Sequence, residues 1–359
     1  MNNVLVDLFT LILKACPFLF SLILWTIVSI TFSKAIKKHA KVLYWISGTL
    51  SFLFFLNYVA GSVLPFKIFS IPILGSIISE FSRAANVIHP LLVIIMFMGA
   101  FSTKHKTIGK LMSIRKELAI FVGFPLLAHI VKRLTHSFLG ACHFFLNYTE
   151  RINHPIVLSK TGAIIQNSVY VLGVVMTVFV LILWITSFTS VRQKMGAAKW
   201  KRWQTRFSYP LYAMLFIHST GLAVNEVMWN KALEDKLGLT LYVESSVEAK
   251  YSGQNELLEG FRDIVMHHLK ESEKAKKEGK PVDNNAMMEE IKNEIAAKAK
   301  DSSKEQEEEA SESFELSEIK ISVKNHAQIS IVVYILIYGS YLFFRLRKAK
   351  SDKLRKKGI

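Results

Sequence analysis

The sequence predicts an all-α integral-membrane protein, a helical bundle of about seven transmembrane helices with a charged segment inserted outside the membrane. Three observations lead to this prediction. The chain of 359 residues is 51% hydrophobic and 20% charged, it contains several long apolar runs, and its charges are concentrated between those runs. Runs of this length are typical of membrane spans and exclude an ordinary water-soluble domain. The two cysteines, Cys16 and Cys142, are too few for a disulfide framework.

The predicted spans are apolar segments that approach or exceed the length needed to cross the hydrocarbon core of a bilayer. They cover residues 11–33, 42–64, 86–102, 118–140, 165–190, 207–228 and 328–345. The third of these is short, and the fourth contains Lys132 and Arg133.

Basic residues are concentrated in alternate connecting segments, and together these hold about half of the 45 Lys and Arg residues. The segments are 34–41, 104–116, 192–206 and the C-terminal tail 345–357. The positive-inside rule makes all four cytoplasmic, which puts the N-terminus outside and the C-terminus inside a multi-pass protein of the cell membrane. The net charge of +17 therefore reflects topology and does not indicate a nucleic-acid partner.

The segment 229–327 differs in composition from the rest of the chain. It carries 22 of the 28 acidic residues and is predicted to lie outside the membrane. Its first part, from Leu237 through Val243 to Leu269, has the hydrophobic pattern of a small amphipathic helical unit, and the Lys/Glu/Ala-rich part is an exposed helix or disordered. The predicted organisation is an added N-terminal helix and basic loop, a transmembrane core, this charged insert, and a last helix with a basic tail, at 1–41, 42–228, 229–327 and 328–359.

Two histidines inside the predicted spans have matching depths. His129 and His218 each lie about 11 residues, or roughly 16 Å, from the cytoplasmic ends of helices that run in the same direction. Paired imidazoles at one depth are what a non-covalently bound haem b requires as axial ligands. The alternative is that each imidazole only hydrogen-bonds a neighbouring helix.

Further polar residues follow His129 along the same span. His136 and His143 continue its spacing of seven, which returns near one helix face, so they are candidates for a second haem site, an exit path or the outer membrane interface. Arg133 lies four residues after His129, in reach of a haem propionate. The alternative for Arg133 and Lys132 is that both side chains extend to the outer interface.

Two stretches of the chain form a recognisable pattern. The first is 115–121 (RKELAIF) followed by 127–129 (LAH); the second comprises 185–187 (ITS), 191–192 (VR), 200–203 (WKRW) and 209–218 (YPLYAMLFIH). Together they resemble the ferric reductase-like transmembrane domain family, and within it the MsrQ-type haem-binding membrane subunits. The resemblance covers residues 42–228 and adds the last span as the sixth helix of a six-helix core, so that the first span is an N-terminal addition.

The resemblance implies that His129 and His218 are the axial ligands of one haem b. In two-haem members of the superfamily, the positions of the inner-haem histidines correspond here to Arg115 and Thr205, which cannot replace imidazoles. No glycine-rich nucleotide motif follows the spans, so electrons are expected from a separate reductase, a quinol, or a docked flavin such as FMN.

We therefore predict a membrane b-type cytochrome that transfers electrons across the bilayer from a cytoplasmic reductase, flavin or quinol to an extracytoplasmic acceptor protein. The cytoplasmic basic loops, with Trp200 and Trp203, are expected either to bind a flavin phosphate or an acidic reductase face, or only to set the topology. The competing prediction is a non-redox transporter or assembly scaffold that presents 229–327 outside. Whether the protein is an oxidoreductase or only an electron carrier stays open.

Overall fold

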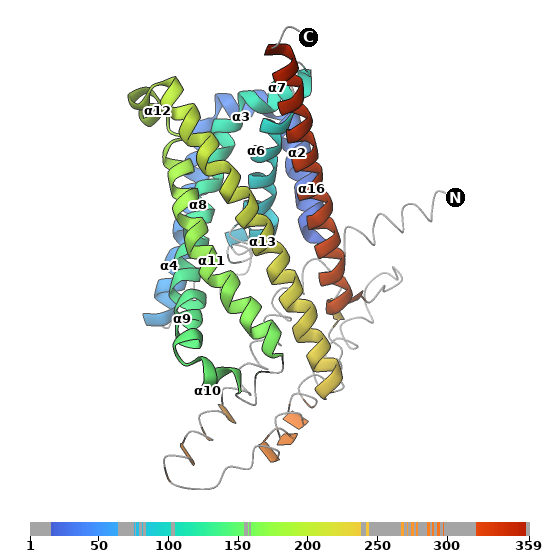
Figure 1. Cartoon of the computed structure of the whole chain (residues 1–359). Coiled ribbons are helices and arrows are strands. Elements are labelled where there is room, and N and C mark those ends of the chain that lie inside the picture. The colour runs from blue at the N-terminus through green and yellow to red at the C-terminus, as the bar shows by residue number, and fades with distance from the viewer. Residues whose placement is uncertain are drawn as a thin grey trace, which may run out of the picture. The chain divides into compact units, whose positions relative to one another are not determined.

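The computed structural model describes residues 16–63, 84–101, 105–153, 159–237, 242–243 and 321–356, with isolated positions between these ranges. Within this part of the chain the fold is helical, as predicted. It contains twelve α-helices, two π-helical turns and one pair of two-residue strands. Figure 1 shows the long helices of the chain.

The chain divides into two compact units. Unit 1 consists of Met1–Leu146, Ile165–Ala223 and Ile329–Ile359, and unit 2 consists of Asn147–Ile164 and Val224–Gln328. The helices wholly within unit 1 are α2 (Pro17–Thr31), α3 (Ser33–Lys38), α4 (Ala40–Val63), α6 (His89–Ala100), α7 (Lys106–Ser113), α8 (Arg115–Arg133), α9 (Leu139–Leu146) and α12 (Thr189–Met195). Three longer helices have residues in both units: α11 (Lys160–Ile185), α13 (Ala197–Leu237) and α16 (Val323–Lys356).

Local sequence explains several helix ends. Pro17 and Pro90 lie in the first turns of α2 and α6, where a missing backbone N–H breaks no helical hydrogen bond. Gly196 ends α12 with a φ of 74°, a left-handed conformation that glycine adopts without steric cost. The helical turn η2 (Ala84–Ile88) leads into α6, and η3 (Leu134–Phe138) joins α8 to α9.

The core of unit 1 is formed by apolar residues from several helices. Helix α4 packs along α8, and α2 packs against α6. Leu91, Met98 and Ile114 are among the fully buried side chains. These packed faces hold α6 and α8, which carry two of the histidines, in one body.

Two basic residues of α16 bind the C-terminal end of α6. The Arg345 guanidinium donates hydrogen bonds to the Gly99 carbonyl (2.9 Å) and the Tyr209 hydroxyl (2.8 Å). The Lys348 ammonium donates to the carbonyls of Gly99 (3.0 Å) and Phe101 (2.7 Å). Cations at a helix C-terminus satisfy unpaired carbonyls and interact favourably with the helix dipole. Part of the basic tail thus has a structural role.

We expect Arg345→Gln to lower the free energy of unfolding by about 1–2 kcal/mol, because hydrogen bonds from a charged group are lost at the end of α6. The measurement is thermal or denaturant unfolding of the full chain in detergent. Arg347→Gln is the matched control, since Arg347 is exposed and one less charge there should change stability by less than about 0.5 kcal/mol. Equal losses in the two variants would contradict this role of Arg345.

Unit 2 contains α10 (Tyr148–Ile152) and a small strand pair. Strand β1 (Tyr242–Val243) pairs antiparallel with β2 (Ile321–Ser322), which brings the two ends of the charged insert together. The amphipathic helical unit predicted from Leu237 to Leu269 is therefore wrong at Tyr242 and Val243, because pairing with a segment about 80 residues later outweighs local hydrophobic spacing. Most of the remaining insert lies outside the described residues.

Each of the seven predicted apolar segments overlaps a helix in the described part of the chain. Two helices, Lys160–Ile185 and Lys324–Leu354, are long and apolar enough to cross a membrane by length and composition. Pro17–Thr31, Ala40–Leu56 and Asn86–Ala100 are apolar but shorter. The segment 118–140 is not one regular α-helix, because η3 interrupts it after Arg133.

Candidate functional site

Three histidines of unit 1 come from different helices, and one of them interacts electrostatically with each of the other two. They are His89 at the start of α6, His129 in α8 and His218 in α13. His218 interacts electrostatically with both of the others. The two histidines chosen from the sequence, His129 and His218, are thus brought into the same region, and His89 joins them.

The orientation of His218 is set by close packing of α13 against α11. Its Nδ1 lies 3.3 Å from the Val169 carbonyl oxygen, so the neutral ring can donate its proton there and leave Nε2 free as an acceptor. Gly221 allows α13 to pack this closely against α11, because a Cβ at position 221 would lie 2.6 Å from Cγ2 of Val169. Gly173 faces the ring from α11, where a Cβ would lie 3.6 Å from Cε1 of His218. A histidine held in this way has the arrangement of a metal-ligating imidazole with an oriented second nitrogen.

His129 lies one turn after Pro125 in α8 and is half-buried. Among the described residues, no group hydrogen-bonds its ring, and its interactions are electrostatic, with His218, Arg133 and Lys132. An interior imidazole without a hydrogen-bond partner keeps both ring nitrogens open for a ligand. The donor chemistry of His129 and His218 therefore fits a pair of axial haem ligands.

Sequence reasoning did not assign a role to His89. Its side chain is only 8% exposed, and its Nε2 lies 2.8 Å from the Tyr338 hydroxyl and 3.5 Å from the Ser219 hydroxyl. The ring stacks on Phe18 with centroids 4.3 Å apart. Its position within a predicted span could have marked His89 as a candidate functional residue. Its partners are distant in sequence, however, so residue spacing could not identify them. His89 joins α6, α13 and α16 beside His218.

The other residues predicted for the site are Arg133, His136 and His143. Arg133 is exposed and donates a hydrogen bond to Ser137 (3.2 Å). His143 is exposed on α9, and His136 lies in η3 with its side chain outside the described part of the structure. Because η3 is wider than an α-helical turn, the regular spacing of seven that was expected to align His129, His136 and His143 does not hold. The candidate second site at His136 and His143 therefore stays a prediction, because the His136 side chain lies outside the described part of the structure.

The two positions that the family resemblance compares with inner-haem histidines lie near the basic segments. Arg115 begins α8, its Nε is buried without a hydrogen-bond partner among the described residues, and burial lowers the pKa of its guanidinium from the ordinary value. Thr205 is exposed on α13. The Arg115 guanidinium also interacts electrostatically with Tyr341 and Arg345.

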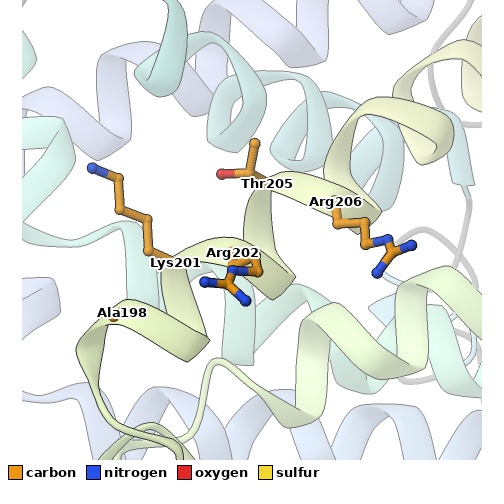
Figure 2. A pocket seen from close by; sticks show the side chains of 5 residues that line it. All are labelled: Ala198, Lys201, Arg202, Thr205 and Arg206. Atoms are coloured by element: carbon orange, nitrogen blue, oxygen red, sulfur yellow. The ribbon is translucent and has the colours of Figure 1, made fainter.

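An open depression of about 660 Å³ lies along the first turns of α13. Its lining residues are Ala198, Lys201, Arg202, Thr205 and Arg206. Figure 2 shows these side chains on successive turns of the helix, with Lys201 and Thr205 extending from the same side. This is the predicted basic segment near Trp200 and Trp203, and its three cations suit an anionic group.

Unit 2 contains the tandem histidines His267 and His268, whose rings are 5.7 Å apart and steeply inclined. Each interacts with a different carboxylate: His267 with Glu271 at 3.6 Å and His268 with Glu294 at 3.3 Å. Across the described part of the chain, no group of three or more His, Cys, Asp or Glu side chains is arranged to hold a metal ion.

The site can thus be described from this chain alone: two imidazoles suited to axial ligation, a third imidazole in a hydrogen-bonded cluster beside them, and a basic helix surface. Comparisons of the chain with protein families, with curated proteins and with solved structures find no match.

Proposed function

We propose that the protein is an integral-membrane b-type cytochrome that transfers electrons across the bilayer from a cytoplasmic reductase, flavin or quinol to an extracytoplasmic acceptor protein. The observation that carries the proposal is that His129 and His218, two imidazoles from separate helices, lie close enough to interact electrostatically. The sequence motifs that resemble the ferric reductase-like transmembrane family end on these same two residues, and we propose that the chain is a member with one haem b.

Exposed apolar residues support a membrane location. On α2, Phe20, Leu24 and Ile27 are each about half exposed and form one stripe of the helix. Similar stripes occur on α11, with Val171, Val175 and Val178, and on α16, whose exposed apolar residues include Val332, Ile335, Leu336, Leu342, Phe343 and Leu346. Large contiguous apolar surfaces are unfavourable in water but suit contact with lipid. Together with the two long apolar helices, they favour a bundle of about seven spans with the basic segments inside.

The residues around the imidazoles support haem binding. Haem bound between two histidines would supply reversible one-electron chemistry at its iron. The protein itself would orient the ligands and exclude water from the haem. The Val169 carbonyl aligns His218, and apolar residues such as Leu172 and Leu126 belong to the core of unit 1. Arg133, which interacts electrostatically with His129, is proposed as the partner of a haem propionate.

The two sides of the membrane have separate proposed roles. Inside, the basic segments would receive the electron donor, either an acidic reductase face or the phosphate of FMN; a quinol would instead reach the helices from the lipid. Outside, the charged insert 229–327 would recruit the acceptor. The strand pair at its ends and the contact between Lys324 Nζ and Glu234 Oε2 (2.6 Å) tie the insert's two ends together within unit 2.

The proposal is tested by the reduced-minus-oxidised absorption spectrum of the full chain purified after expression with sufficient haem. We expect b-type bands, and we expect His129→Ala and His218→Ala each to abolish them because an axial ligand is lost. His143→Ala is the matched control, since this exposed histidine should leave the bands unchanged. Far-UV circular dichroism checks that each variant keeps its helices.

A flat spectrum from folded wild-type protein would overturn the cytochrome proposal and favour the non-redox transporter or scaffold. Bands that survive loss of either histidine would show that the haem has other ligands.

A further inference from the structure

We propose that the exposed face of α13 that begins at the basic depression binds an anionic phospholipid, with the phosphate at Arg202 and Arg206. The proposal depends on the membrane location argued above but not on haem. The face consists of Arg202, Arg206, Tyr209, Ala213 and Ile217, and is called the α13 lipid face below.

The α13 lipid face changes its chemistry along the helix in the order of a phospholipid. Its five residues follow one another at spacings of three or four, so they form one stripe, and all five are exposed. The stripe begins with two guanidiniums, continues with a tyrosine and ends with two apolar side chains, of which Ile217 is 55% exposed. A phospholipid in a membrane has the same order from the surface inward: its phosphate, then its glycerol region, then its acyl chains.

The cations at the start of the stripe lack intramolecular counter-charges. Residues 151–225 contain no Asp or Glu at all. Among the described residues, the Lys201, Arg202 and Arg206 head groups form no ion pair or hydrogen bond. By contrast, Lys116 is paired with Glu117 at 3.2 Å, and Lys348 is bound by the carbonyls at the end of α6. Uncompensated charges grouped around a depression favour an anion from outside the chain.

Neighbouring aromatic residues favour lipid over an acidic protein as the source of that anion. Trp203 is 38% exposed and its ring lies 5.2 Å from that of Phe207, at the boundary between the basic and apolar parts of α13. Trp and Tyr concentrate at this level of a membrane because one end of each ring system is apolar and the other polar. The Arg345 guanidinium lies over the Tyr209 ring, 5.5 Å from its centroid, which adds a further cation beside the tyrosine of this face.

The experiment is native mass spectrometry of the full chain in neutral detergent, equilibrated with equal amounts of phosphatidylglycerol and phosphatidylcholine of the same chain length. We expect phosphatidylglycerol adducts to predominate. R202Q/R206Q should weaken phosphatidylglycerol binding about 30-fold, since each basic residue near an anionic lipid contributes roughly a factor of five. The double variant K34Q/K37Q removes the same charge from the exposed helix α3 and should change binding by less than about three-fold.

Two further binding measurements identify the source of the phosphate. I217Q should weaken phosphatidylglycerol binding, because the acyl chain loses an apolar contact, and millimolar inorganic phosphate should not displace the lipid. Displacement by phosphate would overturn the proposal in favour of a free-anion site. Binding of poly-glutamate without binding of phosphatidylglycerol would overturn it in favour of an acidic protein partner.

Equal losses in R202Q/R206Q and K34Q/K37Q would also overturn the proposal, since binding would then follow total charge alone. The b-type spectrum separates this proposal from the proposed function. R202Q/R206Q should keep the bands because neither arginine is near the imidazoles in sequence, whereas failure of the cytochrome proposal would remove the bands from the wild type and leave lipid selectivity intact.

Discussion

Replacing Gly123 with alanine should lower the free energy of unfolding by about 3 kcal/mol, the largest effect expected from a single added methyl group in unit 1. A Cβ at Gly123 would lie 1.8 Å from Nε1 of Trp184 and 2.0 Å from its Cδ1, so the indole must move. Moving it breaks the hydrogen bond from Nε1 to the Ile120 carbonyl (3.2 Å) and the edge contacts with Phe124 and Phe188. The measurement is unfolding in detergent, followed by far-UV circular dichroism.

Gly339→Ala is the matched control. It also adds a methyl group inside a long helix, but nothing lies within 4 Å of the new atom. There we expect unchanged or slightly higher stability, because alanine favours the helix by about 0.5–1 kcal/mol. The double variant G123A/W184L should recover part of the loss by removing the obstructing indole. Similar stability for Gly123→Ala and Gly339→Ala would show that Trp184 does not pack against α8.

Replacing His89 with leucine should cost about 2–3 kcal/mol of stability, because the buried Tyr338 hydroxyl loses a hydrogen-bond partner. The single variant Tyr338→Phe should cost about 1 kcal/mol, the usual net contribution of one hydrogen bond. The double variant H89L/Y338F should lose less than the sum of the two, with a coupling of about 1 kcal/mol, since both changes remove the same 2.8 Å contact. The readout is again the unfolding free energy of the full chain.

The same variants separate His89 from the proposed haem ligands. We expect Y338F and folded H89L to retain b-type bands, because His89 is engaged by Tyr338 and Ser219 and stacked on Phe18. Loss of the bands in H89L, as complete as in His129→Ala, would make His89 an axial ligand instead of a neighbouring support. Additive effects in the double variant would contradict the hydrogen bond itself.

Helix positions were largely predictable because apolar composition is a local property of the chain. Each predicted apolar segment overlaps a described helix, and the turn at Gly196 and the prolines at helix starts follow from local chemistry. Helix ends and irregularities were less predictable. The π-helical turn after Arg133 and the extension of α13 to Leu237 depend on packing partners that periodicity does not reveal.

The candidate site was predictable in part for the same reason. Depth along a helix depends only on residue count, so the sequence could place His129 and His218 at one predicted depth. The surroundings of these two histidines could not be predicted from the sequence. The hydrogen-bond partners of His89 and His218 are Val169, Ser219 and Tyr338, and the hydrogen bond between His89 and Tyr338 joins positions 249 residues apart.

The sequence by itself determined that the chain is helical, where its apolar segments lie and on which side its basic segments are expected, because hydrophobicity and charge act residue by residue. Tertiary structure decided which side chains meet: that Gly221 admits Val169 beside His218, that Gly123 admits Trp184, and that His89 lies close to His218. Contacts of this kind depend on how closely two backbones approach, and that distance is set by the packing of the whole unit.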